Sequence, residues 1–142
     1  MTIAIVAAAL IAACGSSASS SSATMSISGA WARPAAAGGQ SAAYLTMTNT
    51  SGTMDALLSA TSPAAGKVEL HETSVDGSGM TGMHPVARVD VPAGQAVELK
   101  PGSYHLMLMG LTGELAVGKT IELDLVFEKA GKVVVQAEIR QG

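Results

Sequence analysis

Short runs of alternating apolar and polar residues, each closed by a turn, restrict the fold of this chain more than any other feature. From about residue 25 to residue 142, no window keeps an apolar stripe of helical period over three turns. The predicted strands are 26–33, 42–49, 56–61, 67–73, 84–91, 96–99, 104–111, 120–128 and 132–140. Pro, Gly, Asn or Ser residues follow most of these runs. Short strands at this spacing predict an all-β chain, folded as an antiparallel Greek-key sandwich or barrel.

The composition shows what must fill the core of such a sandwich and what its surface does not bind. Hydrophobic residues make up 48% of the chain but aromatic residues only 3%. We therefore expect a core of Val, Leu, Ile and Ala. The net charge is −3 and the eight Lys and Arg residues are scattered, which excludes a nucleic-acid-binding surface.

The first 24 residues are predicted to lie outside the fold. Residues 3–13 are wholly apolar, but a membrane-spanning helix needs about 20 such residues, so the segment is typical of a signal peptide. Small residues before Cys14 resemble a bacterial lipobox. We predict a lipoprotein-type signal peptide over residues 1–14, a Ser-rich flexible tether over 15–24 and one domain over 25–142. The alternative is a plain secretory signal in which Cys14 is incidental.

Lipidation of Cys14 implies an extracytoplasmic chain, anchored to the bacterial membrane in the periplasm or on the outer face of the cell. Cys14 is also the single cysteine. The domain therefore contains no disulfide, no multi-cysteine zinc site and no cysteine nucleophile.

Metal-binding side chains alternate with leucines along residues 104–109. Successive side chains of a strand point to opposite faces. Leu106 and Leu108 therefore share the core face, and His105, Met107 and Met109 share the other. A pair of outward methionines has no packing role on a soluble surface, although single core methionines and surface histidines are common.

A second group of such residues flanks a glycine-rich turn. The alternation of residues 68–71 points His71 away from the core. The chain then turns through residues 76–79 and returns with Met80, Met83 and His84. We expect two histidines and up to four methionines to converge at one end of the sandwich.

The donor types select among metals. Thioether sulfur is a soft ligand that favours Cu(I), and imidazole also suits copper. Zinc sites prefer cysteines, and calcium and magnesium prefer oxygen ligands. A blue-copper electron-transfer site needs a Cys thiolate with two His, which the domain lacks. No Ser-His-Asp arrangement or phosphate-binding loop is present, so we expect no enzyme.

These residues resemble the PCuAC family of periplasmic copper(I) chaperones. The family pattern is His, ten residues, Met, twenty-one residues, His, one residue, Met, and residues 84–104 are the twenty-one between Met83 and His105. Segments 30–34, 68–73, 101–105 and 107–111 match as well. Eleven residues, not ten, separate His71 from Met83; the insertion falls in the turn, where an extra residue costs little.

The resemblance implies a cupredoxin-like or immunoglobulin-like sandwich that binds one Cu(I). The predicted metal ligands are His71, Met83, His105 and Met107, with Met80, Met109 and His84 in reserve. The implied function is delivery of copper to the dinuclear copper site of cytochrome c oxidase, directly or through another chaperone. The expected partners are cytochrome c oxidase subunit II or another copper chaperone, and the membrane through the lipid anchor. We expect a monomer. The alternative function is a lipid-anchored binding or scaffold module of the same fold without metal.

Overall fold

Ten β-strands form the protein in a computed structural model that describes residues 24–142. They are β1 (Met25–Ala32), β2 (Gln40–Asn49), β3 (Asp55–Thr61), β4 (Ala65–Val75), β5 (Thr81–Pro85), β6 (Val89–Val91), β7 (Ala96–Leu99), β8 (Tyr104–Leu111), β9 (Thr120–Phe127) and β10 (Gly131–Ile139). The all-β prediction is confirmed. Within residues 24–142 no helix is long and apolar enough to cross a membrane. Cys14 and the predicted signal peptide lie outside the described residues.

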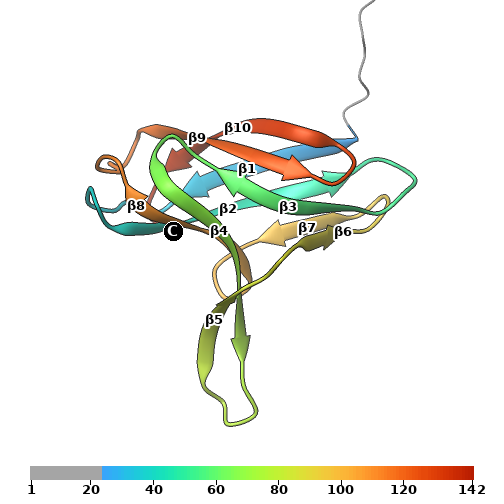
Figure 1. The fold of residues 1–142 in the computed structure, drawn as a ribbon, viewed down its shortest axis with the longest axis horizontal. Helices are drawn as coiled ribbons and strands as arrows, with labels where there is room; N and C mark the ends of the chain where they lie inside the picture. Colours follow the sequence, from blue (N-terminus) through green and yellow to red (C-terminus); the bar gives the residue numbers. More distant parts are fainter. Residues whose placement is uncertain (1–23) are drawn as a thin grey trace, which may run out of the picture.

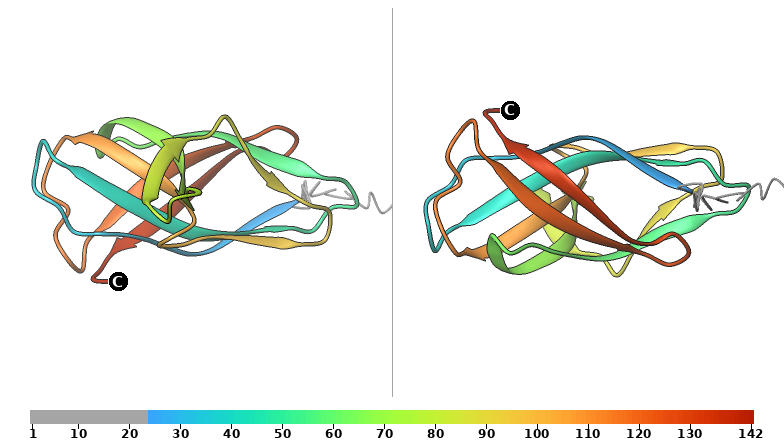
Figure 2. Two further views of the ribbon diagram at one scale, coloured as in Figure 1. Left: turned by 90° about the horizontal axis from the view of Figure 1, so that it is seen from below. Right: turned by 90° about the horizontal axis from the view of Figure 1, so that it is seen from above.

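The strands follow the order β5-β4-β8-β2-β1-β10-β9-β3-β6, and β7 also pairs with β2. Neighbours are antiparallel except β1 and β10, which are parallel. Figures 1 and 2 show the sheet folded over itself into two layers, with β3, β9 and β10 across from β2, β4 and β8. The predicted mostly antiparallel sandwich is therefore confirmed.

The core between the layers consists of aliphatic side chains, as the composition predicts. Its largest fully buried residues include Leu45, Met47, Leu57, Leu99, Leu106, Leu108, Leu123, Leu125 and Ile139. Leu106 and Leu108 are fully buried, which confirms that they face the core. Of the four aromatic residues, Phe127 alone belongs to this core cluster.

The β4–β5 hairpin projects from the body of the sandwich (Figure 1). The predicted single strand over 84–91 is wrong, because the chain there forms two strands. β5 pairs with β4, whereas β6 pairs with β3 in the other layer. Pro85 has no N–H to donate, but Val86 still donates to the carbonyl of Leu70 (2.9 Å) before the chain crosses between the layers.

Buried polar groups stabilise the end of the sandwich at which β1 begins. Asn49 is fully buried. Its amide nitrogen donates to the carbonyls of Thr53 (2.8 Å) and Val91 (3.0 Å), and its oxygen accepts from the backbone N–H of Ser51 (2.9 Å). One side chain therefore connects β2 to the following turn and to β6.

Asp55 stands beside it and is 2% exposed. Its carboxylate accepts hydrogen bonds from the backbone N–H groups of Ala56 (2.8 Å), Lys129 (2.9 Å) and Ala130 (2.9 Å). Burial alone would raise the pKa of Asp55, but these donors and the charge of Lys129 lower the pKa below its ordinary value. Both buried side chains at this end thus have their hydrogen-bonding groups satisfied.

Candidate metal centre

Strand register brings His71 and His105 together. β4 and β8 are antiparallel neighbours, and His71 lies directly opposite His105. The two ring centroids are 5.7 Å apart. On the other side of β4, Met83 of β5 lies opposite Thr73. Because opposite residues of an antiparallel pair share a face, these residues and Met107 follow the outer surface of one layer.

His105 is 3% exposed, although it lies on the outer face of its strand. Its Nδ1 is 3.1 Å from the backbone oxygen of Ser103. A carbonyl oxygen only accepts, so Nδ1 carries the hydrogen and the neutral ring keeps its lone pair on Nε2. This Nε2 is buried and has no hydrogen-bond partner.

His71 repeats this arrangement with the nitrogens exchanged. Its Nε2 is 2.9 Å from a carboxylate oxygen of Glu69, which also forms an ion pair with Lys67. The hydrogen bond from His71, and then that from Lys67, lowers the pKa of the Glu69 carboxyl. Nε2 is thus the donor, and the lone pair on Nδ1 is buried without a partner.

Two lone pairs without partners in one small region are unusual in a folded protein. A buried polar group with no hydrogen bond costs about 1–3 kcal/mol. Histidines that bind metals typically donate their other N–H to a carboxylate or a backbone carbonyl. His71 and His105 do so through Glu69 and Ser103, whose supporting role was not predicted. The position of Glu69 on the same face, two residues before His71, was the available signal.

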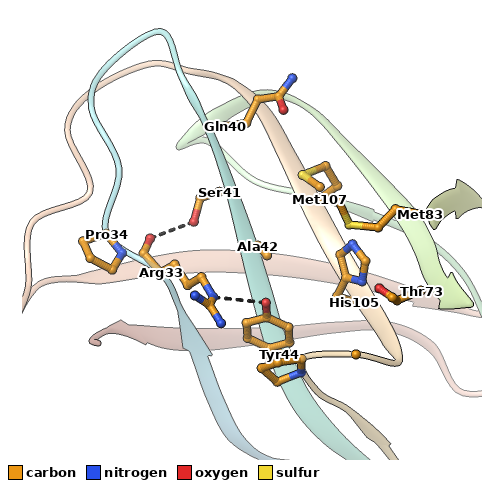
Figure 3. A pocket seen from close by; sticks show the side chains of 12 residues that line it. Arg33, Pro34, Gln40, Ser41, Ala42, Tyr44, Thr73, Met83, His105 and Met107 are labelled. Carbon is orange, nitrogen blue, oxygen red and sulfur yellow. Dashed lines mark hydrogen bonds between the residues drawn. The ribbon is translucent and has the colours of Figure 1, made fainter. Parts of the chain in front are cut away.

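Thioethers complete the surroundings of His105. Met83, His105 and Met107 line a cleft of about 410 Å³. Figure 3 shows Met83 and Met107 beside the imidazole of His105. Met107 is partly buried, whereas Met83, on the projecting hairpin, is 58% exposed. Imidazole nitrogens and thioether sulfurs together favour a soft metal ion such as Cu(I).

The reserve residues lie further out. Met80, near the hairpin tip, is 69% exposed and lines a separate hollow with Met83 and His84. His84 is opposite Glu72 in the ladder, with its Nε2 3.4 Å from that carboxylate. Met109 lies opposite Lys67, beyond Met107 along β8. Within residues 24–142, no group of three or more His, Cys, Asp or Glu could hold a metal, so methionines are needed to complete a site.

A row of rings continues from the two histidines across the outer face. The ring centroid of Tyr44 is 6.4 Å from that of His105, and the centroids of Tyr44 and Trp31 are 4.6 Å apart. The guanidinium of Arg140 lies 5.0 Å from the Trp31 ring centroid. We call His71, His105, Tyr44, Trp31 and Arg140 the aromatic row. Its first four residues lie on the adjacent strands β4, β8, β2 and β1, and Arg140 directly follows β10, the next strand in that order.

Arg33 lies beside this row and lines the same cleft. Its Nε donates to the Tyr44 hydroxyl (3.2 Å), as drawn in Figure 3. Sequence reasoning did not assign a role to Trp31, Arg33 or Tyr44.

Comparison with known proteins identifies similar sequences. The family model described as "Putative lipoprotein LpqE-like" matches residues 25–139. A Leifsonia xyli protein, "Putative lipoprotein Lxx21020", is 37% identical over 101 residues, covering 71% of this chain and 60% of that protein. The uncharacterized protein RP573 of Rickettsia prowazekii is 29% identical over 117 residues, covering 77% and 62%. The chain thus spans about three fifths of the length of these curated relatives.

Solved structures share the fold. The apo PCuAC domain from PmoF1 superimposes with a TM-score of 0.72 at 28% identity, covering 84% of this chain and 95% of that one. The solution structure of Cu(I)-DR1885 from Deinococcus radiodurans gives 0.62 at 30% identity, covering 88% and 86%. The copper-bound PCuAC domain from PmoF2 gives 0.70 at 24% identity, with coverage of 84% and 94%.

Proposed function

The chain belongs to the LpqE-like family, which is the PCuAC family, and from that premise we propose that it is an extracytoplasmic Cu(I)-binding metallochaperone. The proposed ligands are His71, His105, Met83 and Met107. One of the similar structures is that of DR1885 in its Cu(I) form. This likeness supports the same cargo here.

One observation carries the proposal. The lone pairs of His71 Nδ1 and His105 Nε2 are buried without partners, and each ring is held by a hydrogen bond through its other nitrogen. A metal ion that accepts both lone pairs removes the cost of leaving them unsatisfied. Because all four proposed ligands are neutral and two are soft, Cu(I) fits better than zinc.

The unequal burial of the ligands suits a carrier that must release its cargo. His105 is buried, whereas Met83 is 58% exposed on a projecting hairpin. We expect a recipient to displace Met83 first and the histidines last. No covalent bond in a substrate is broken, so the proposed activity is not enzymatic. Delivery to the dinuclear copper site of cytochrome c oxidase, and an anchor at Cys14, belong to the same proposal.

Copper binding is tested on the full chain carrying Cys14→Ser, so that the one thiolate does not compete for Cu(I). Anaerobic competition with a chromogenic chelator should show one Cu(I) per chain. X-ray absorption should count two nitrogen and two sulfur ligands. Failure to retain Cu(I) against a weak chelator would favour the metal-free scaffold alternative.

The matched pair Met83→Leu and Met80→Leu identifies the hairpin ligand. Leu keeps the approximate volume of Met, so either change should cost less than about 1.5 kcal/mol of stability. We expect Met83→Leu to lower Cu(I) affinity about tenfold, which corresponds to about 1.4 kcal/mol, and Met80→Leu to leave the affinity unchanged. The reverse result would assign the ligand to Met80.

A further inference from the structure

Two of the four aromatic residues, Trp31 and Tyr44, lie on the outer face of the sheet near the copper cleft, with Trp31 partly exposed and Tyr44 buried. Trp31 and Tyr44 belong to the aromatic row, and Phe127 alone is in the core cluster. Trp, Tyr and Arg are the residues that dominate the energetics of protein interfaces.

The charge on this part of the surface is opposite to that of the whole protein. Arg33 and Arg140 are exposed, and neither forms an ion pair with a carboxylate of residues 24–142. Glu138, opposite Trp31 in the ladder, is the acidic residue of this area. Counting side chains, two arginines and one carboxylate give it positive charge, whereas the chain has a net charge of −3. Gly142, the last residue of the sequence, lies against Trp31.

We propose that Trp31, Arg33 and Arg140 form the docking surface for a copper-receiving protein that presents carboxylates around its own copper ligands. The inference rests on the proposed copper function. Arg33 lines the cleft with Met83 and Met107, so a carboxylate paired with it brings the recipient's ligands next to the cargo. Trp31 supplies rigid apolar contact area beside the charges, and the buried Tyr44 packs against it from the sheet.

An anionic membrane is the competing occupant, and the position of the surface argues against it. The predicted tether precedes Met25, the first residue of β1, whereas Trp31 lies near the other end of that strand and Arg33 directly follows it. With the proposed anchor at Cys14, the chain reaches the domain from the opposite end of β1. The docking surface is therefore at the end of β1 that is further along the chain from the anchor.

The test measures the rate of Cu(I) transfer by stopped flow from the loaded full chain with Cys14→Ser. One acceptor is a peptide with two cysteine thiolates flanked by aspartates. The other is identical except that asparagines replace the aspartates. Opposite charges at the rim of an interface raise the association rate and make it depend on salt. We expect about tenfold faster transfer to the acidic peptide at low salt, with the advantage falling as salt increases.

Variants assign this advantage to the proposed surface. Arg140→Gln should reduce the faster transfer to the acidic peptide, and the double variant Arg33→Gln with Arg140→Gln should remove most of it. Glu138→Gln should increase the difference between the two peptides. Lys129→Gln changes charge equally at the far β9–β10 turn and should have no effect. Equal rates with both peptides, or an equal loss with Lys129→Gln, would overturn the docking surface.

Two further measurements keep the outcomes separate. Equilibrium Cu(I) affinity is determined for every variant against a neutral chelator, so that failure of the copper function is recognised by itself. Binding to phosphatidylglycerol vesicles is the second. Arginine-dependent binding to these vesicles, with no preference for the acidic peptide, would assign the surface to the membrane and overturn the proposal.

Discussion

Two clusters of polar side chains, Asn49 with Asp55 and His71 with His105, differ in one respect. In the first every side-chain hydrogen-bonding group is satisfied, and in the second two buried ring nitrogens are not. Asn49 and Asp55 form hydrogen bonds to backbone groups of several elements. His71 and His105 each leave one buried ring nitrogen without a partner. The first cluster stabilises the fold, and the second keeps lone pairs available to a ligand.

The difference shows how such a domain can be stable and still hold an incomplete site. Asn49 is opposite Met25, where β1 begins, whereas His71 is opposite Pro85 of the β4–β5 hairpin. This hairpin projects from the sandwich (Figure 1). A metal ion can therefore bind and leave without disturbing the bonds that join the turns to the sandwich. Each of the following substitutions tests one side of this comparison.

The largest effect is expected at the satisfied cluster. Asp55→Ala leaves the backbone N–H groups of Ala56, Lys129 and Ala130 without their acceptor. At about 1–3 kcal/mol for each buried unsatisfied donor, we expect the free energy of unfolding to fall by about 3 kcal/mol or more. Chemical denaturation measures it. The Cu(I) affinity of the folded fraction should be unchanged, and a parallel loss of affinity would show that the clusters are coupled.

A smaller effect, on copper instead of stability, is expected from Glu69→Ala. Loss of the carboxylate frees the His71 ring to exchange tautomers and rotate, and removal of such a supporting group typically costs about 10–100-fold in metal affinity. Glu72→Ala is the matched control, because Glu72 pairs with His84 outside the cleft. Nitrogen chemical shifts of His71 report its tautomer, and Glu69→Gln, whose amide oxygen still accepts, should restore much of the affinity. Equal losses in Glu69→Ala and Glu72→Ala would contradict the positioning role.

Removal of a lone pair should have little effect on the apo fold. His105→Phe keeps a ring against Tyr44 and deletes the unsatisfied Nε2. The Ser103 carbonyl still accepts the Thr73 N–H (3.1 Å). We expect the free energy of unfolding to stay within about 1 kcal/mol of the wild-type value or to rise, while Cu(I) binding is lost. Thermal melts with copper competition measure both, and strong destabilisation would mean that His105 is a structural residue.

The sequence predicts which face of a strand each residue occupies better than it predicts which strands pair. Alternation along β8 placed Leu106 in the core and His105 on the opposite face, and the strand bounds 96–99 and 104–111 agree with the structure. Alternation is a local property, so it can be followed residue by residue. The pairing of His71 with His105 depends on register between distant strands, and here the resemblance to a family supplied what periodicity does not.

The supporting contacts could not be predicted, because they depend on which strands become neighbours. The connection between Asp55 and the β9–β10 turn joins residues more than seventy positions apart. The aromatic row needs β1, β2 and β8 side by side. The break in the strand predicted over 84–91 likewise follows from the crossing between layers, which begins after the backbone hydrogen bond from Val86 to Leu70 (2.9 Å).

The smallest expected effect is on the pH dependence of stability, which should differ between variants of Asp55 and Asp76, although the pKa values of both carboxyls are lowered. Burial alone would raise the pKa of Asp55, but its backbone N–H donors lower the pKa below the ordinary value. In the exposed hairpin turn, the hydrogen bond from Ser78, together with backbone N–H donors, lowers the pKa of Asp76. A lowered folded-state pKa gives stability that is present above the unfolded value, about 3.8, and is lost as pH falls from there through the folded value. Asp55 closes contacts between strands that separate only on global unfolding, whereas Asp76 closes one turn that can open locally. Acid unfolding followed by circular dichroism should therefore lose part of its pH dependence below about pH 4 in Asp55→Asn and keep it in Asp76→Asn. If Asp76→Asn flattens the acid limb as much as Asp55→Asn does, the hairpin unfolds together with the sandwich, and the separation of a stable end from an adaptable one is wrong.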